Sequence, residues 1–184
     1  MRRSSLVLGM LCLGMLFPAV WSDEQKPIDK KPAATAKDPM DQVFERLKKL
    51  SGEWELAKPS ELAPKGKVAS RYRLTAGDSA VAETIFPDTN MEMLSVYHRD
   101  GEQLVMTHYC CAGNQPRMRA KIGKDKDEVI FEFTGGGNLD PAKDPHIHGG
   151  VIRFVDADHI HSEWEFHVNG KVADKHVFDL IRKK

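Results

Sequence analysis

The sequence predicts an all-β domain, a single antiparallel up-and-down β-barrel of about ten strands with one N-terminal α-helix. Beyond residue 50, short β-type segments follow one another and are separated by turn residues. No second helical pattern interrupts them, and 184 residues allow one domain or at most two small ones. Successive antiparallel strands of this kind build a closed barrel or a sandwich.

The first 22 residues have the pattern of a secretory signal peptide. Arg2 and Arg3 precede an apolar run over residues 6–17, which is shorter than the roughly 20 residues of a membrane span. Cleavage is expected after Ser22, or alternatively after Ala19, and an uncleaved anchor is the other interpretation. The mature protein is therefore expected to be secreted or periplasmic, without stable membrane insertion.

Charge and cysteine content narrow the possible functions. The chain has 27 basic and 27 acidic residues, so loss of Arg2 and Arg3 with the leader leaves 25 against 27, a net charge of −2. A dedicated nucleic-acid-binding domain normally carries a basic excess, so we expect no nucleic-acid partner. The adjacent Cys110 and Cys111 would close only a strained ring, so the core must hold the fold.

A linker and a helix precede the strands. Residues 23–37 are rich in Pro, Ala and Lys, which is typical of a flexible linker, and the barrel domain is expected over 38–184. Asp38 suits a helix N-cap and Pro39 the first helical position. One apolar stripe then follows to the expected helix end near Leu50: Met40, Val43, Phe44, Leu47 and Leu50.

The predicted strands cover residues 53–58, 67–75, 79–86, 91–98, 103–111, 116–123, 127–134, 150–156, 159–168 and 171–182. Asp100-Gly101 and Asn169-Gly170 are strong hairpin signals, because both residue types tolerate positive φ.

The Asn169-Gly170 hairpin has two possible registers. A strict two-residue turn gathers His161, Glu163 and His176 on the face of Phe178. A turn with a glycine bulge shifts the pairing by one residue. Trp164 and Phe166 then share a face with Val172, His176, Phe178 and Leu180, while Glu163 and Glu165 face outward with Lys175. We favour the bulged register because it separates polar from apolar side chains, and unpaired buried charge is unfavourable.

Gly52-Glu53-Trp54, directly after the helix, resembles the opening of calycin barrels, the lipocalin-like superfamily. In that superfamily the Trp packs across the closed end of the barrel and an Arg of the last strand covers it. The resemblance implies structural roles for Gly52, Trp54 and Arg182, with a cation–π contact worth about 0.5–2 kcal/mol.

A second stretch, residues 93–118, carries a more specific resemblance. Its segment His108-Tyr109-Cys110-Cys111-Ala112-Gly113-Asn114-Gln115-Pro116 resembles an uncharacterised family of secreted bacterial calycin-like proteins, a domain of unknown function. Cys111 departs from that family, which has Ala there. Ser162-Glu163-Trp164 and Asn169-Gly170-Lys171 are also similar, so the resemblance covers roughly residues 40–184. It implies a fold and a compartment but no assigned activity.

Strand alternation indicates where a ligand would bind. Residues 103–111 place His108 on the face of Leu104, Met106 and Cys110, toward the interior. The resemblance implies a cavity at the open end of the barrel, so the predicted function is binding of an unidentified apolar or amphipathic small molecule. The candidate ligand-binding residues are Met93, Tyr97, Met106, His108, Asn114, Gln115 and Arg117. The two amides and the Arg117 guanidinium of the 113–117 loop could bind a polar or anionic ligand at the barrel mouth. Alternatively, the amides satisfy the backbone of a tight turn.

Two His-Ile-His triplets suggest an alternative metal- or haem-binding barrel. Residues i and i+2 of a strand project to one face about 6–7 Å apart, which suits zinc, copper or haem iron. The candidate ligands are His108, His148 and His161. Against this, residues 159–168 alternate as a solvated strand face does, and His146 and His148 are expected in a loop.

An enzyme of unknown reaction ranks last among the hypotheses. The motifs G-x-S-x-G, H-E-x-x-H and the Walker loop are absent from the sequence. On one strand face, Cys110 and His108 would lie about 7 Å apart, beyond hydrogen-bond reach. We therefore assign no catalytic residue and no cofactor, and expect a monomer or a homodimer.

Overall fold

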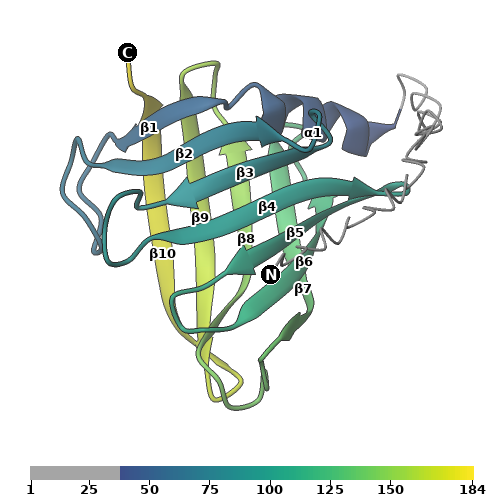
Figure 1. Ribbon diagram of the computed structural model, residues 1–184, viewed down its shortest axis with the longest axis vertical. Helices are drawn as coiled ribbons and strands as arrows, with labels where there is room; N and C mark the ends of the chain where they lie inside the picture. Colours follow the sequence, from purple (N-terminus) through teal and green to yellow (C-terminus); the bar gives the residue numbers. More distant parts are fainter. Residues whose placement is uncertain (1–37) are drawn as a thin grey trace, which may run out of the picture. The chain divides into compact units, whose positions relative to one another are not determined.

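A computed structural model describes residues 38–184, which form a closed barrel of ten antiparallel strands preceded by one helix (Figure 1). The predicted all-β up-and-down barrel is confirmed. The leader and the linker predicted over residues 1–37 lie outside the described residues. No helix within residues 38–184 has the length and hydropathy of a membrane span.

The elements are α1 (Pro39–Lys48), β1 (Gly52–Leu56), β2 (Val68–Thr75), β3 (Ala80–Ile85), β4 (Met93–Asp100), β5 (Gln103–Tyr109), β6 (Gln115–Ile122), β7 (Glu128–Gly137), β8 (His146–Phe154), β9 (His159–Val168) and β10 (Lys171–Arg182). Each strand pairs with the next in the chain, and β1 pairs with β10 to close the barrel. The expected start of β8 at residue 150 was wrong, because the strand begins at His146 and includes His148.

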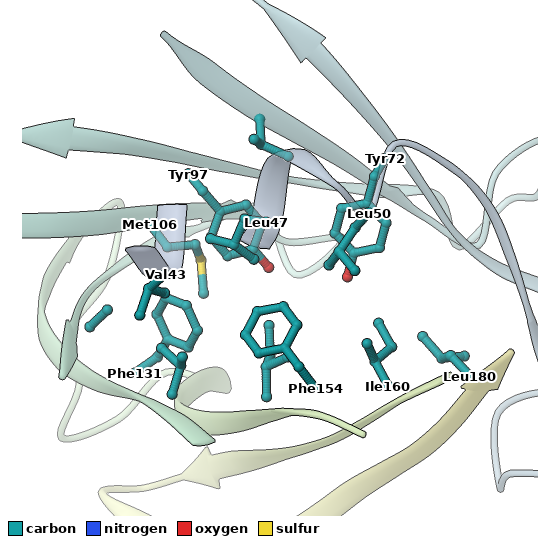
Figure 2. Packing of buried hydrophobic residues seen from close by; sticks show 14 of the residues in the cluster. Val43, Leu47, Leu50, Tyr72, Tyr97, Met106, Phe131, Phe154, Ile160 and Leu180 are labelled. Carbon is teal, nitrogen blue, oxygen red and sulfur yellow. The ribbon is translucent and has the colours of Figure 1, made fainter. Parts of the chain in front are cut away.

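Helix α1 closes one end of the barrel. The Asp38 carboxylate accepts a hydrogen bond of 2.8 Å from the backbone N–H of Met40, which caps the helix as predicted. Val43, Phe44 and Leu47 are buried in the apolar core. Figure 2 shows side chains of this helix facing core residues of the barrel interior. The apolar stripe of the sequence is therefore the face that fills this end.

Trp54 lies under the helix at the closed end and is fully buried. Its Nε1 donates a hydrogen bond of 2.7 Å to the Leu50 carbonyl. The Arg182 guanidinium lies 4.4 Å from the centre of the indole and donates to the carbonyls of Lys49 and Ser51 at 2.9 Å each. The expected contact between Arg182 and Trp54 is present, and it joins the last strand to the start of the first.

The β9–β10 hairpin combines parts of both expected registers. Asn169 and Gly170 both have positive φ, 53° and 69°, so they form a two-residue turn of the I′ type. The register then shifts between Val172 and Asp174, inside β10, so that His176 pairs with Trp164. The favoured pairing beyond this point is confirmed, but the bulge lies in the strand rather than at the turn glycine. Val172 precedes the shift and is 57% exposed.

The connections alternate between the two ends of the barrel, as up-and-down order requires. The loops at residues 57–67, 86–92, 110–114, 138–145 and 169–170 belong to the end opposite α1, which we call the open end. In Figure 1 the helix lies at the top, and the β9–β10 hairpin turns at the bottom.

Candidate functional site

A cavity of about 210 Å³ occupies the open end of the barrel. Residues of β8, β9 and β10 form an apolar wall: Ile147, Trp164, Phe166, Phe178 and Leu180. Residues of β2, β3, β4 and β5 form a polar wall: Ser70, Glu83, Ser95 and His108. Leu62 and Met91, which are 45% and 44% exposed, lie at its mouth. The cavity therefore has one side rich in hydrogen-bonding groups and one mostly apolar side, to which Ser162 of β9 and His176 of β10 add two polar side chains.

Register places the polar residues in one row. Glu83 pairs with Ser95 across β3 and β4, and Ser95 pairs with His108 across β4 and β5. Directly paired residues of antiparallel strands point to the same face of the sheet. All three are buried, at 6%, 2% and 5% exposure, so this row faces the barrel interior.

Glu83 accepts hydrogen bonds from two hydroxyl groups. Ser70 Oγ donates to Oε1 at 2.7 Å, and the Tyr97 hydroxyl donates to Oε2 at 2.6 Å. Burial raises the pKa of Glu83, and the hydrogen bonds from Tyr97 and Ser70 oppose that shift. Burial and the nearby Glu83 charge raise the pKa of Tyr97 well above its usual value, so this hydroxyl remains a donor.

His108 has one ring nitrogen bonded and one without a partner. Its Nδ1 lies 2.9 Å from Ser95 Oγ, while its buried Nε2 has no hydrogen-bond partner among the described residues. Burial lowers the pKa of His108 from 6.5 to about 4, so the imidazole is neutral at neutral pH. An unpaired buried polar atom is unfavourable by about 1–3 kcal/mol. A ligand in the cavity would supply the missing partner.

The predicted ligand-binding residues separate into two groups. Met93, Met106 and His108 line the cavity. Tyr97 is fully buried beside it, with its hydroxyl on Glu83.

The residues predicted on the 113–117 loop stabilise or flank the turn. Asn114 Nδ2 donates to the Pro145 carbonyl at 2.8 Å, and Gln115 Nε2 donates to the Gly113 carbonyl at 3.1 Å. Arg117 is exposed. The Gln115 contact stabilises the turn itself, whereas the Asn114 contact joins this turn to the loop before β8.

Glu83 was missed from the sequence, although a signal existed. Val81 and Ile85 lie two residues to either side, so period-two alternation places Glu83 on their face. Ser70, Ser95 and Trp164 were also not named as cavity residues, because the identity of facing strands depends on register.

Cys110 and Cys111 line the cavity from the β5–β6 turn as free thiols. Burial raises the pKa of the Cys110 thiol, and the neighbouring Cys111 raises it further. A raised pKa disfavours the thiolate, which is the nucleophilic form.

The three predicted metal ligands lie in different environments. His108 is in the interior. His161 contacts two carboxylates: its Nδ1 lies 2.7 Å from Asp179 Oδ1 and its Nε2 lies 3.1 Å from Glu163 Oε1. A different set of residues within 38–184 brings possible metal-ligand atoms within 4.8 Å of one another. It consists of Glu61, Asp174 and His176. The first two of these are exposed.

His148 belongs to a histidine cluster where β7 and β8 separate. The two strands pair from Glu128 to Glu132, and β8 then continues to His146 against β9 alone. The rings of His148 and His167 are nearly parallel, with centroids 4.0 Å apart, and His148 Nδ1 lies 2.9 Å from His146 Nε2. Burial, then the neighbouring His167 and His146, lower the pKa of His148. The imidazoles thus pack and hydrogen-bond with one another.

Comparisons with known proteins found no matching family model and no match among curated proteins.

Proposed function

We propose that the protein binds a small amphipathic molecule in the cavity at the open end of its barrel. The observation that carries this proposal is His108 Nε2, which is buried at the polar wall of the cavity and has no hydrogen-bond partner among residues 38–184. Ligand sites are mostly apolar concave spaces with a few convergent polar groups, and this cavity has that composition. Met93 and Met106 add flexible side chains that adapt to a bound shape.

The hydroxyl–imidazole pair of Ser95 and His108 also occurs in nucleophilic enzymes, but there a third group orients the imidazole. Within residues 38–184, the second nitrogen of His108 contacts no carboxylate or other polar partner. Binding is therefore favoured over covalent catalysis.

Calorimetric titration of the full chain with ethylbenzene tests the binding function. The Met93→Trp variant places a large side chain at the cavity wall and should abolish binding. Val172→Trp is the matched control, because Val172 is 57% exposed and is not among the residues that line the cavity. Saturable binding by the wild type and by Val172→Trp, but not by Met93→Trp, is expected. Equal binding to Met93→Trp would refute the proposal, as would the failure of ethylbenzene and of polar molecules of the same ring size to bind the wild type.

We also propose that the protein acts outside the cytoplasm and belongs with calycin-like secreted barrels. The basic start and apolar run of the leader support export. The Trp54–Arg182 contact supports the calycin-like relationship. Mass spectrometry of protein secreted or recovered from the periplasm should give a chain that begins after Ser22 or after Ala19. An intact Met1 terminus in all fractions would contradict export.

A further inference from the structure

We propose that the cavity selects a compact, uncharged molecule with one hydroxyl or carbonyl group, which hydrogen-bonds to His108 Nε2. This inference rests on the binding function proposed above and specifies the class of ligand. Size, the distribution of free hydrogen-bonding groups and the charge of the lining residues support it separately.

Size limits the ligand to a compact molecule. An apolar protein cavity of about 150 Å³ holds benzene, which has six carbon atoms. At the same cavity volume per non-hydrogen atom, the 210 Å³ present here holds about eight such atoms. A substituted single ring or a short branched chain fits this space, whereas a long-chain lipid does not fit without expansion of the barrel.

Hydrogen-bonding capacity on the polar wall is concentrated at His108. Ser70 and Tyr97 both donate to Glu83, and Ser95 Oγ is bonded to His108 Nδ1. On this wall, His108 Nε2 remains unpartnered within the described residues. On the opposite wall, His176 Nδ1 also lacks a hydrogen bond, but it lies 3.7 Å from the Asp174 carboxylate. Because Ser95 Oγ can accept or donate, Nε2 is either an acceptor or a donor, and it suits both a hydroxyl and a carbonyl. One polar group on the ligand therefore completes the row.

Charge on the lining residues disfavours an anion. Among residues 38–184, those that line the cavity include neither Lys nor Arg, and burial keeps His108 neutral. Near the mouth, Glu61 and Asp174 lie beside His176 and add negative potential. A carboxylate ligand would lose its hydration without gaining an opposite charge, which is strongly unfavourable.

A cation is also disfavoured. Glu83 is the carboxylate on the cavity wall, and its two oxygens already accept hydrogen bonds from Ser70 and Tyr97. An ammonium group would have to displace these donors or remain unpaired after losing its hydration. The neutral imidazole and the apolar wall of Trp164 and Phe178 together match an uncharged molecule best.

Four ring-matched probes test this selection: ethylbenzene, p-ethylphenol, benzoate and benzylamine. Calorimetry on the full chain at pH 7.5 should rank p-ethylphenol first, with benzoate and benzylamine at least about tenfold weaker. His108→Phe should weaken p-ethylphenol binding about fivefold to tenfold, the value of one hydrogen bond, and change ethylbenzene binding less than about twofold. His159→Phe, at the start of β9, is the matched control and should change neither.

A second measurement uses the wild-type protein, so its outcome does not depend on whether a variant folds. With ¹⁵N-labelled histidine in the wild type, p-ethylphenol should shift the Nε2 resonance of His108, and ethylbenzene should not produce the same hydrogen-bond shift. Benzoate binding as tight as p-ethylphenol binding, or an unperturbed Nε2 resonance at saturation, would refute this inference while the binding function stands. Failure of all four probes, ethylbenzene included, would refute the binding function itself.

Discussion

The same strands form both ends of the barrel, but one end is densely packed and the other contains a cavity. At the closed end, α1 inserts Val43, Phe44 and Leu47 into the core, and Arg182 covers Trp54 while donating to backbone carbonyls. At the open end, no helix formed by residues 38–184 fills the space, and a cavity with a buried nitrogen that lacks a partner among these residues remains. The comparison teaches that dense packing at one end stabilises a barrel whose other end can remain hollow.

Truncation of one apolar side chain at each end should give the largest difference in the free energy of unfolding. Leu47→Ala removes a side chain that is 1% exposed and should lower the free energy of unfolding by about 2–5 kcal/mol. Met93→Ala acts on a partly exposed side chain that already borders empty space, so its effect should be below about 1 kcal/mol. Urea unfolding of both variants measures the difference. Equal losses would show that the open end also contributes dense packing.

Acidification should destabilise the fold through His108 at the open end by about 3 kcal/mol. His108 has a pKa near 6.5 when unfolded and about 4 when folded, so between these values the unfolded chain binds more protons. Its contribution is complete above pH 6.5 and is lost as the pH falls through about 4. Urea unfolding from pH 7 to pH 4 should show this loss in the wild type.

His108→Phe should reduce that loss by about 3 kcal/mol, because the shifted group has been removed. Glu83 remains in both proteins, so its own titration cancels in the comparison. His159→Phe serves as the control and should keep the wild-type slope. Parallel wild-type and His108→Phe curves would show that His108 does not stay neutral in the fold.

Loss of the Arg182 contacts at the closed end should have a somewhat smaller effect on stability. Arg182→Ala removes the contact with Trp54 and the bonds to the Lys49 and Ser51 carbonyls, and should destabilise the fold by about 2–3 kcal/mol. Thermal unfolding followed by near-ultraviolet circular dichroism measures it. Arg182→Lys keeps the charge but not the forked geometry, so it should recover only part of the loss. Full recovery by Lys would attribute the effect to charge alone.

The helix cap should give the smallest effect. Asp38→Ala removes the acceptor for the Met40 N–H and should lower stability by about 1 kcal/mol. Asp38→Asn keeps a capping oxygen while it removes the charge that contacts Arg99, so chemical denaturation of both variants separates the two roles. If Asn is as destabilising as Ala, the ion pair rather than the cap is the important contact.

Local signals made much of the fold predictable. Period-two alternation and turn residues located all ten strands, and the Asp38-Pro39 cap located the helix, because these features act through neighbours in the chain. His108 was placed in the interior for the same reason. Its partner Ser95 and the Glu83 network were not foreseen, since they depend on which residues face one another across strands. The start of β8 was missed because Gly149-Gly150 resembles a loop in sequence.

Closure of the barrel also has a consequence for the order of folding. Ser51 and Arg182 are hydrogen-bonded although they stand 131 positions apart, so the first strand gains its second neighbour only when the last has been synthesised. Until then the edge of β1 lacks a partner, and contacts of such high sequence separation form slowly. A nascent chain therefore remains open at least until Arg182 has been synthesised. Such a chain can be threaded through a narrow pore before it acquires its native topology.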